Sequence, residues 1–578
     1  MDYILKKYLP RIEFDSYEDF KAEYKVNVPD NFNFGFDVVD DWAENEPDKR
    51  ALVWCNDRED DAYEEYVFTF ADIKHRSNQM CNYFKSLGIK KGDRVMLIMK
   101  RRYEYWITVT ALHKLGAVII PATFQLTEKD LIYRINAASV KMIICAPDEY
   151  IIDHVENSQA QCPTLQHKAL VIGEKINRAQ MEATKKPSGI ANTDIRSGWL
   201  NYCEGYLAQD SVYNRPIGTD EDVMSNDLMI IYFTSGTTGM PKMVQHVQSY
   251  PLGHIVTAKY WQCVEENGLH LTVADSGWAK FSWGKIYGQW ISGSAVLGYD
   301  HVKFDAFKLL KVMSNFKITT FCAPATMYRF MIKEDIEQFD FSYLHHCCMA
   351  GEPLNPEVFH QWERITGHKL YEGFGQTEGP VLLANFKWLT PKPGSTGKPT
   401  PAFDIKLCNS EGKECEIGEE GEIVICDAAA KRLTGLTIGY ASYDNSALFA
   451  GGDYHTGDNA WFDEEGYYWF IGRVDDVIKC SGYRIGPFEV ESAIMTHPSV
   501  LECAVTAAPD PVRGQVVKAT IVLARGYEPS EELKTEIKNH VKRVTAPYKY
   551  PRIIDFVDEL PKTTSGKIKR NVLRQNSK

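Results

Sequence analysis

The 14 cysteines of this sequence include no C-x-x-C pair. Secreted disulfide scaffolds are shorter and denser in cysteine, and C-x-x-C pairs mark many zinc and redox sites. With 578 residues, the chain is also long enough for several domains. We therefore expect reduced, unpaired thiols in a reducing compartment, and we exclude a disulfide framework.

Long apolar runs are missing as well. No stretch reaches the roughly 18 residues that a membrane-spanning helix needs. The first twenty residues lack the apolar core of a secretory signal and are too acidic for an organelle transit peptide. These features favour a cytoplasmic protein without membrane insertion.

Positive charge is scarce relative to negative charge. Asp and Glu number 78 against 65 Lys and Arg, so the formal net charge is −13. Proteins that bind a nucleic-acid backbone usually have the opposite balance, so we expect no nucleic-acid partner. A local basic cleft for a small anionic ligand is still compatible with this charge.

Strand and helix patterns alternate between residues 95 and 145. A helical pattern ends before Gly116, which suits a helix C-cap, and Thr127 suits the N-cap of the next helix. The runs typical of buried strands are Val95–Met99, Val118–Ile120 and Lys141–Cys145. The alternation predicts an α/β fold of layered subdomains with mainly parallel sheets, and a different layering of the same elements is the alternative.

The last hundred residues have a different pattern. Pro487 suits a helix start, and Ser530 suits an N-cap before apolar residues at four-residue spacing. An alternating stretch between these two helices, VVKATIVLA, is typical of a strand. The pattern predicts a small α+β domain over residues 475–578, after a large N-terminal domain over residues 1–474.

A loop rich in glycine and hydroxyl groups follows the apolar run Asp227–Phe233. Its sequence is TSGTTGMPK, residues 234–242. Glycines let a backbone approach a phosphate, and amides, hydroxyls and Lys242 can then donate hydrogen bonds to its oxygens. The spacing differs from the Walker A motif, so the loop is either another kind of phosphate cradle or a polar surface turn.

Four further segments accompany this loop. In chain order, the five are YFTSGTTGMPK (232–242), YEGFGQTEG (371–379), YHTGD (454–458), GRVDDVIKCSGYRIGPFEVE (472–491) and PKTTSGKIKR (561–570). They resemble the signature segments of the adenylate-forming superfamily, which includes acyl-CoA synthetases, peptide-synthetase adenylation domains and luciferases. The resemblance covers nearly the whole chain. It implies activation of a carboxylate with ATP as an acyl-adenylate, release of pyrophosphate, and transfer of the acyl group to a thiol.

The resemblance also implies roles for residues of an ATP site. Lys567 would bridge the substrate carboxylate and the α-phosphate, Thr377 would bind the same groups, and Glu378 would bind Mg²⁺. Asp458 would hold the ribose hydroxyls. The implied ATP- or AMP-binding residues are Thr234, Ser235, Gly236, Thr237, Thr238, Gly239, Lys242, Glu372, Gly373, Phe374, Gly375, Gln376, Thr377, Asp458 and Arg473.

A second set of residues belongs to the thiol step. The resemblance implies that the small domain rotates about a hinge at Asp475 between the two half-reactions. Gly482 would then let the pantetheine arm of coenzyme A pass close to the backbone. The implied CoA-binding residues are Ser481, Gly482, Tyr483, Arg484, Arg513, Lys542, Tyr550 and Gln125.

The strongest resemblance within the superfamily is to medium-chain acyl-CoA synthetases, through segments such as PDPVRGQVVKA and VTAPYKYPR. Acetate-activating relatives carry a Trp where this sequence has Gly375. We expect the lost indole to open volume for a medium-chain or branched short-chain acid. Lys280 and Lys285, in the same region, are expected to be solvated. The residues expected to line the acyl pocket are Gly375, Trp278, Phe281 and Trp283.

Two other functions stay open. An adenylation enzyme that feeds a carrier-protein thiol would share the first half-reaction, but the CoA-type arginines argue against it and no carrier domain follows Lys578. A non-catalytic nucleotide-binding protein would not need Lys567, Glu378 and Asp458. The expected partners are a small carboxylic acid, ATP and CoA, with Mg²⁺ as cofactor and a homodimer as candidate assembly.

The run His345-His346-Cys347-Cys348 looks like a metal cluster. Neighbouring residues of an extended segment point to alternate sides, so the four side chains cannot all meet one ion. We expect neither a metal site nor a catalytic cysteine in this run.

Overall fold

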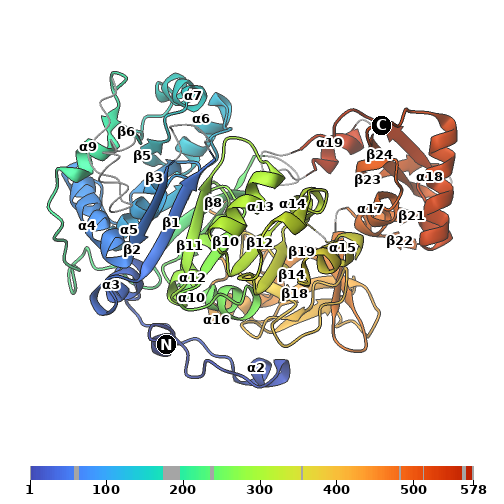
Figure 1. The fold of residues 1–578 in the computed structure, drawn as a ribbon, viewed down its shortest axis with the longest axis horizontal. Coiled ribbons are helices and arrows are strands. Elements are labelled where there is room, and N and C mark those ends of the chain that lie inside the picture. Colours follow the sequence, from blue (N-terminus) through green and yellow to red (C-terminus); the bar gives the residue numbers. More distant parts are fainter. Residues whose placement is uncertain are drawn as a thin grey trace.

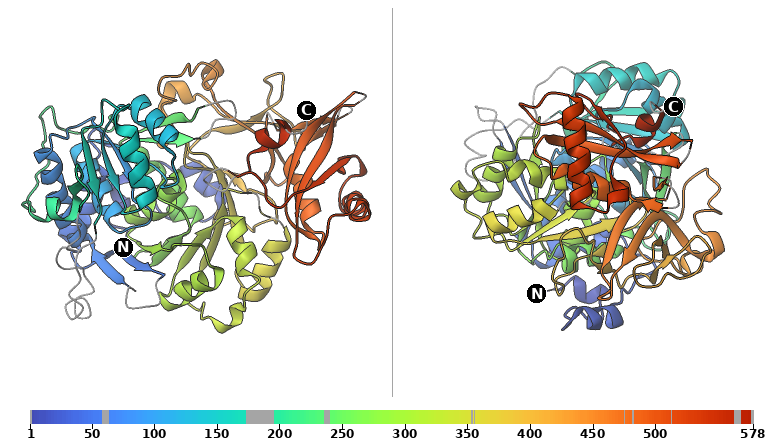
Figure 2. Two further views of the ribbon diagram at one scale, coloured as in Figure 1. Left: turned by 90° about the horizontal axis from the view of Figure 1, so that it is seen from above. Right: turned by 90° about the vertical axis from the view of Figure 1, so that its right-hand side faces the viewer.

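The computed structural model describes residues 2–57, 64–172, 195–234, 240–352, 354, 356–474, 476–480, 483–511, 513–562 and 568–575. Within these residues, the strands form sheets of nine, seven, five and four strands. Figure 1 shows the two largest sheets in one body and the C-terminal sheet at one end of the molecule, and Figure 2 shows the same arrangement from two further sides.

The seven-stranded sheet is mostly parallel, as the sequence predicts. Near its centre, β3 pairs in parallel with both β4 and β5. The last strand, β9, is antiparallel to β8. In sheet order, the strands are β7 (Leu200–Asn201), β6 (His167–Leu170), β5 (Val140–Cys145), β3 (Arg94–Ile98), β4 (Val118–Pro121), β8 (Leu228–Thr234) and β9 (Lys242–Val247).

Local signals in the sequence set the ends of two helices beside this sheet. Helix α5 (Glu104–Leu115) stops at Gly116, whose φ of 71° lies in the left-handed region that glycine tolerates. Helix α6 (Glu128–Ala137) starts with a capping box: the Thr127 hydroxyl accepts from the amide of Asp130, and the Asp130 carboxylate accepts from the amide of Thr127. Both expected caps are confirmed.

The nine-stranded sheet is parallel over its central strands and antiparallel at both edges. Parallel strands bring their carboxyl ends to one edge, where open α/β sheets usually bind ligands. In sheet order, the strands are β16 (Lys398–Pro399), β15 (Val381–Ala384), β14 (Leu370–Gly375), β13 (His346–Ala350), β12 (Thr320–Ala323), β10 (Leu269–Thr272), β11 (Ala295–Asp300), β1 (Arg50–Asn56) and β2 (Glu65–Thr69).

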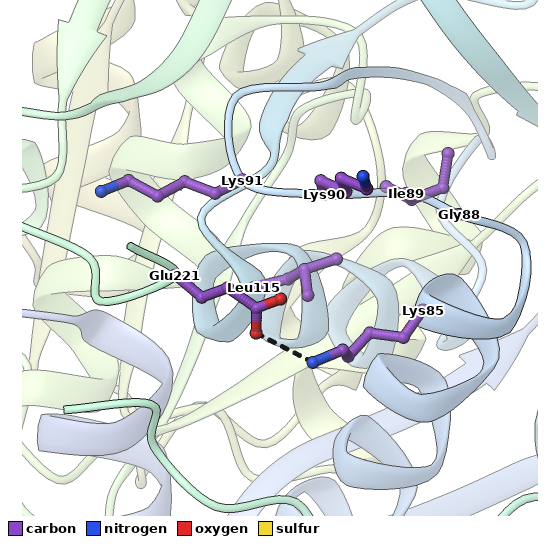
Figure 3. Close-up of a pocket in the computed structure, with 7 residues that line it drawn as sticks. All are labelled: Lys85, Gly88, Ile89, Lys90, Lys91, Leu115 and Glu221. Carbon is purple, nitrogen blue, oxygen red and sulfur yellow. Dashed lines mark hydrogen bonds and ion pairs between the residues drawn. The ribbon is translucent and has the colours of Figure 1, made fainter. Parts of the chain in front are cut away.

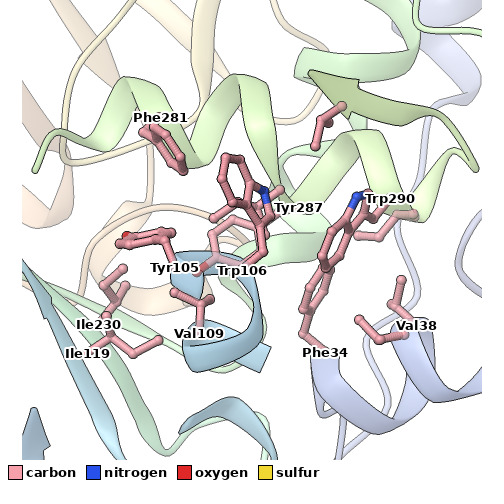
Figure 4. Packing of buried hydrophobic residues seen from close by; sticks show 14 of the residues in the cluster. Phe34, Val38, Tyr105, Trp106, Val109, Ile119, Ile230, Phe281, Tyr287 and Trp290 are labelled. Carbon is pink, nitrogen blue, oxygen red and sulfur yellow. The ribbon is translucent and has the colours of Figure 1, made fainter. Parts of the chain in front are cut away.

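A layer of helices lies between the two large sheets, because one apolar cluster draws residues from both sheets and from these helices. Figure 4 shows Tyr105 and Trp106 packed on Phe281, with Phe34 and Trp290 stacked beside them. The helices of this layer are α4 (Phe70–Ser86), α5, α11 (Ala279–Lys285) and α12 (Tyr287–Ile291).

Two outer layers complete the body. Helices α13 (Ala306–Asn315), α14 (Ala325–Met331) and α15 (Pro356–Thr366) cover the other face of the nine-stranded sheet (Figure 1). Helices α6 and α7 (Glu149–Gln159) cover the seven-stranded sheet from outside. The layering agrees with the predicted α/β class.

A four-stranded antiparallel sheet follows in the chain, and a five-stranded sheet comes last. The first contains β17 (Ile405–Cys408), β18 (Gly421–Ile425), β19 (Tyr454–Phe462) and β20 (Tyr468–Arg473). The second contains β21 (Ile478–Cys480), β22 (Tyr483–Ile485), β23 (Val500–Asp510), β24 (Gly514–Leu523) and β25 (Ile553–Phe556).

Two helices pack on the five-stranded sheet as expected. Helix α17 (Pro487–Met495) has Pro487 in its first turn, and α18 (Glu531–Val544) is capped by Ser530, which accepts from the amide of Leu533. The domain boundary at 474/475 stays a prediction, and its hinge residue Asp475 lies outside the described residues.

All 14 cysteines lie in described residues and are free thiols. Among the helices of the described chain, none has both the length and the apolar character that a bilayer crossing requires.

The capping box of α6 gives a first testable expectation. Thr127→Ala removes the hydroxyl that caps the helix and should lower the free energy of unfolding by about 1 kcal/mol. Thr127→Ser keeps a hydroxyl and should lower the free energy of unfolding by clearly less. Urea unfolding at equilibrium measures both, and equal costs for Ala and Ser would show that the hydroxyl is not the stabilising group.

Candidate functional site

Thr377 and Glu378 follow β14 at the carboxyl edge of the nine-stranded sheet. The Nε2 of His246, on β9, donates to the backbone oxygen of Thr377 at 2.8 Å. Burial lowers the pKa of His246 to about 4, so its ring is neutral near pH 7 and Nε2 carries the proton. This contact joins the predicted catalytic pair to the strand that follows the glycine-rich loop.

The Glu378 residue is held twice. Its Oε1 accepts from the hydroxyl of Tyr440 at 2.8 Å, and its backbone oxygen accepts from the amide of Thr437 at 2.7 Å. Among the described residues, Oε2 of Glu378 has no hydrogen-bond partner. A hard carboxylate oxygen held this way fits Mg²⁺, which prefers oxygen ligands.

The glycine-rich loop is the connection of a β-hairpin. Thr234 ends β8, Lys242 begins β9, and the two residues pair across the hairpin. The Nζ of Lys242 lies 4.6 Å from the ring centroid of Tyr440. The predicted residues Ser235, Gly236, Thr237, Thr238 and Gly239 lie outside the described residues, as does Lys567.

Asp458, the predicted ribose contact, faces Arg473, another predicted nucleotide-binding residue, across β19 and β20. The Nη1 of Arg473 is 3.5 Å from Oδ2 of Asp458, whose side chain is nearly buried. The Gln376 amide reaches across from the end of β14: its Nε2 donates to the Asp458 carboxylate and, at 2.8 Å, to the backbone oxygen of Thr456. Its Oε1 accepts from the hydroxyl of Tyr454 at 2.7 Å. Three of the signature segments therefore meet here, 371–379, 454–458 and 472–491.

The predicted residues on β14 itself pack tightly. A Cβ on Gly373 would come within 2.5 Å of the Trp261 ring, so this position has no room for a side chain. Glu372 is buried, and burial raises the pKa of its carboxyl to about 8. Phe374 is half-buried and stacks on Phe470 with a centroid separation of 5.5 Å.

Sequence reasoning missed His246 and Tyr440. A signal existed for His246, because β-strand alternation places it on the same side as Lys242, four residues earlier. Tyr440 lies in a loop with no motif around it, so its role follows only from the folded chain.

Helix α11 carries Phe281 and Trp283, two of the four predicted acyl-pocket residues. Phe281 is fully buried in the core between Tyr105 and Trp106. The ring of Trp283 lies directly on Gly375, because a Cβ there would be 2.2 Å from Cη2 of Trp283. The volume that the missing indole at position 375 was expected to open is therefore occupied by a second indole. Trp278 is half-buried and precedes the helix.

The expected solvation of Lys285 is wrong. Its side chain is only 1% exposed, and its Nζ lies 5.3 Å from the ring centroid of Phe281, one helical turn earlier. Burial, and then the charge of Arg101, lower the pKa of Lys285 to about 7. Lys280 is half-buried and donates to the backbone oxygen of Ala350 at 2.6 Å.

The predicted CoA-binding residues lie in two places. Lys542 lies on α18, Arg513 directly precedes β24, and Tyr550 lies between α18 and β25. The ring of Tyr550 lies 4.2 Å from the Lys542 ammonium and 4.9 Å from the guanidinium of Arg552. Gln125 is exposed in the loop after β4.

Two of the remaining CoA residues, Tyr483 and Arg484, lie on β22, which pairs with β21. Cys480, at the end of β21, pairs with Gly514 beside Arg513. Ser481 and Gly482 lie outside the described residues.

The His345–Cys348 run alternates as expected. Cys347 packs in the outer core and Cys348 in the central core, on opposite faces of β13. His346 Nε2 donates to the backbone oxygen of Trp261 at 2.8 Å, and His345 is paired with Glu265.

A cavity of about 80 Å³ is lined in part by residues that directly precede β3 and β4 in the chain. Two of its three lysines pair with carboxylates: Lys85 with Glu221 at 2.8 Å, shown as a dashed line in Figure 3, and Lys91 with Asp227 at 2.7 Å. The lining residues are Lys85, Gly88, Ile89, Lys90, Lys91, Leu115 and Glu221.

Comparison with protein families decides the class. Residues 39–431 match the model of the AMP-binding enzyme, and residues 489–567 match the AMP-binding enzyme C-terminal domain. The chain belongs to the AMP-binding enzyme family. The predicted superfamily is therefore confirmed.

Individual relatives narrow this class. The chain is 40% identical over 572 residues to the mitochondrial acyl-coenzyme A synthetase ACSM3 of Rattus norvegicus, covering 97% of this chain and 93% of the relative. It is 40% identical over 557 residues to the mitochondrial ACSM5 of Homo sapiens, covering 95% and 91%. The expected enzyme class, an AMP-forming acid:CoA ligase, is confirmed. These relatives are named as mitochondrial and give no support to a cytoplasmic location.

Solved structures agree with this assignment. The anthranilate CoA ligase AuaEII, in complex with anthranoyl-AMP, matches with a TM-score of 0.82 at 28% identity, covering 95% of this chain and 98% of the ligase. An acyl-CoA synthetase of Brucella canis matches with a TM-score of 0.70 at 28% identity, covering 98% and 99%. The expected fold class is confirmed.

The buried Lys285 makes stability depend on pH in a defined direction. Its pKa is about 7 in the folded chain against 10.5 ordinarily, so between these values only the unfolded chain holds the proton. Stability should therefore rise with pH in this window, by at most about 1.4 kcal/mol per unit. Lys285→Met removes this contribution.

Urea unfolding of the wild type and of Lys285→Met between pH 6 and 9 measures the difference. Above pH 7, we expect the free energy of unfolding of the wild type to increase relative to that of Lys285→Met. Lys280→Met, a control on the same helix, should follow the wild-type pH dependence. Parallel curves for the wild type and Lys285→Met would contradict the burial of a titrating amine.

Proposed function

We propose that this enzyme joins a medium-chain or branched short-chain carboxylic acid to coenzyme A, with ATP converted to AMP and pyrophosphate. The observation that carries the nucleotide half is the hydrogen-bonded assembly at the carboxyl edge, in which Gln376 contacts Asp458 and Tyr440 contacts Glu378. This assembly supports one polyanionic nucleotide with a ribose at Asp458 and phosphates near Lys242.

In the first half-reaction, a carboxylate oxygen of the acid attacks the α-phosphorus of ATP. A new P–O bond forms, the bond to pyrophosphate breaks, and the acyl-adenylate results. Both reactants are anions, so the enzyme has to position them and balance their charge. Lys242 and Lys567 supply positive charge, and Asp458 orients the ribose.

Glu378 and the ATP phosphates would hold Mg²⁺, which supplies positive charge to the phosphate oxygens. The contact from Tyr440 fixes one oxygen of that carboxylate.

In the second half-reaction, the thiolate sulfur of coenzyme A attacks the acyl carbon. The C–S bond forms, AMP leaves with the C–O bond electrons, and the thiol proton passes to solvent. Arg513, Arg484 and Lys542 are the cations proposed for the CoA phosphates, with the small domain turning about Asp475. A carrier-protein thiol is the competing acceptor.

In this proposal, Trp283 determines which carboxylic acids the enzyme accepts. Since its ring covers Gly375, it limits the pocket where the acyl chain would pass. An aliphatic chain is favoured over a strongly polar acid, because the walls contributed by Trp278 and Trp283 are aromatic.

Lys567 tests the mechanism by half-reaction. Lys567→Ala should reduce adenylate formation, read as pyrophosphate release, by about 100- to 1,000-fold, because a cation aimed at the transition state is lost. Thioester formation from supplied acyl-AMP and CoA should stay near the wild-type rate. Lys569→Ala is the matched control. Equal loss of both half-reactions in Lys567→Ala would contradict the assignment of Lys567 to adenylate formation.

Trp283 tests the acyl pocket. Trp283→Gly should shift the preferred acid toward longer chains, with a change of about 10- to 100-fold in the ratio of kcat/KM for octanoate over butyrate, as expected for burial of added methylenes. Trp283→Phe should give a smaller shift. A panel of straight, branched and aromatic acids, read as AMP and acyl-CoA, measures it; unchanged relative rates would remove Trp283 from the pocket.

The cytoplasmic location and the homodimer stay predictions. Cell fractionation tests the first against the mitochondrial location of the named relatives, and light scattering after size-exclusion chromatography tests the second.

A further inference from the structure

We propose that Tyr440 is a positioning residue of the nucleotide site, which holds the carboxylate of Glu378 with its hydroxyl and the ammonium of Lys242 with its ring. This inference rests on the proposed function, because it assigns a role within the same ATP site. It adds one side chain, from a loop without a signature motif, that sets both charges expected to face the phosphates.

The two contacts of Tyr440 differ in kind. The hydroxyl donates to Oε1 of Glu378 at 2.8 Å, while the Lys242 Nζ lies 4.6 Å from the ring centroid. An aromatic face attracts a cation, and a phenol donates well to a carboxylate. Within the described residues, Lys242 has no carboxylate partner. The phenol thus holds an anion and a cation at separate places on one rigid group.

The backbone around Tyr440 is fixed on the strand that carries Lys242. The amide of Ala441 donates to Met243 at 2.9 Å, and the amide of Ile438 donates to Gln245 at 3.1 Å, so residues 438–441 run beside β9. The Asn445 side chain accepts from the Tyr440 amide at 2.8 Å and donates to its carbonyl at 3.0 Å. These contacts therefore fix the position of the Tyr440 ring relative to Lys242.

The hydroxyl of Tyr440 donates to Oε1 of Glu378 and so fixes which oxygen of the carboxylate is engaged. Because the carboxylate accepts at Oε1, its orientation is set before any ligand arrives, and Oε2 is the oxygen left for a metal ion.

Partners that orient a metal ligand typically change metal affinity or activity by about 10- to 100-fold when they are removed. Tyr440→Phe keeps the ring and loses only the hydroxyl. We expect the Mg²⁺ concentration for half-maximal adenylate formation to rise at least about tenfold in this variant. We expect the affinity for ATP in EDTA to stay at the wild-type value.

Tyr440→Leu removes the ring as well. It should show the same rise in the Mg²⁺ concentration for half-maximal adenylate formation and also a weaker affinity for ATP in EDTA, because Lys242 loses the ring that holds it. Isothermal titration with ATP, with and without Mg²⁺ and without any acid, reads both effects independently of turnover. Tyr443→Phe, an exposed tyrosine of the same loop, is the matched control.

Two outcomes separate this inference from the proposed function. Unchanged Mg²⁺ dependence and MgATP affinity in Tyr440→Phe overturn the role of Tyr440. If the wild type forms no acyl-CoA from supplied acyl-AMP and CoA, the proposed function is overturned instead.

A folding defect is recognised by the double variant. In Glu378→Gln, whose amide oxygen can no longer serve as an anionic ligand, adding Tyr440→Phe should not raise the Mg²⁺ requirement further. An additional rise of similar size would show that Tyr440 acts through the stability of the loop, and would overturn the proposal.

Discussion

The amide of Gln376 is the contact on which the site depends, because it joins two sheets that the chain builds far apart. Its nitrogen donates to Asp458 and to the backbone of Thr456, and its oxygen accepts from Tyr454. The nitrogen and the oxygen of this half-buried amide therefore both have hydrogen-bond partners. Hydrogen bonds are directional, so they fix the orientation of the amide, which a hydrophobic contact would not do. Together with the stacking of Phe374 on Phe470, this amide fixes the position of the Asp458 carboxylate relative to the end of β14.

Much of the fold follows from short-range signals. The Thr127 cap, the glycine after α5 and the apolar strands around residue 95 depend on residues within one or two turns of each other, and a single sequence contains all of that information. The predicted site residues Asp458 and Arg473 pair across neighbouring strands, and Gln376, next to Thr377 and Glu378 after the end of β14, contacts Asp458.

What the sequence leaves undetermined depends on packing between distant segments. Helical spacing alone puts Lys285 on the Phe281 face of α11, but the composition of that helix does not tell which face meets the core. Tyr440 reaches Glu378 across 62 residues of sequence, and no local pattern announces such a contact. Trp283 fills the space above Gly375 for the same reason: the two positions meet only after the sheet and α11 pack.

The contact between Trp283 and Gly375 has a consequence for how such an enzyme diversifies. The two positions lie 92 residues apart, and a Cβ at position 375 would meet the Trp283 ring at 2.2 Å and the backbone oxygen of Pro380 at 2.7 Å. A side chain at position 375 therefore requires a smaller residue at position 283 and a shift of the backbone at Pro380. Among homologous chains, larger residues at position 375 should occur only together with smaller residues at position 283.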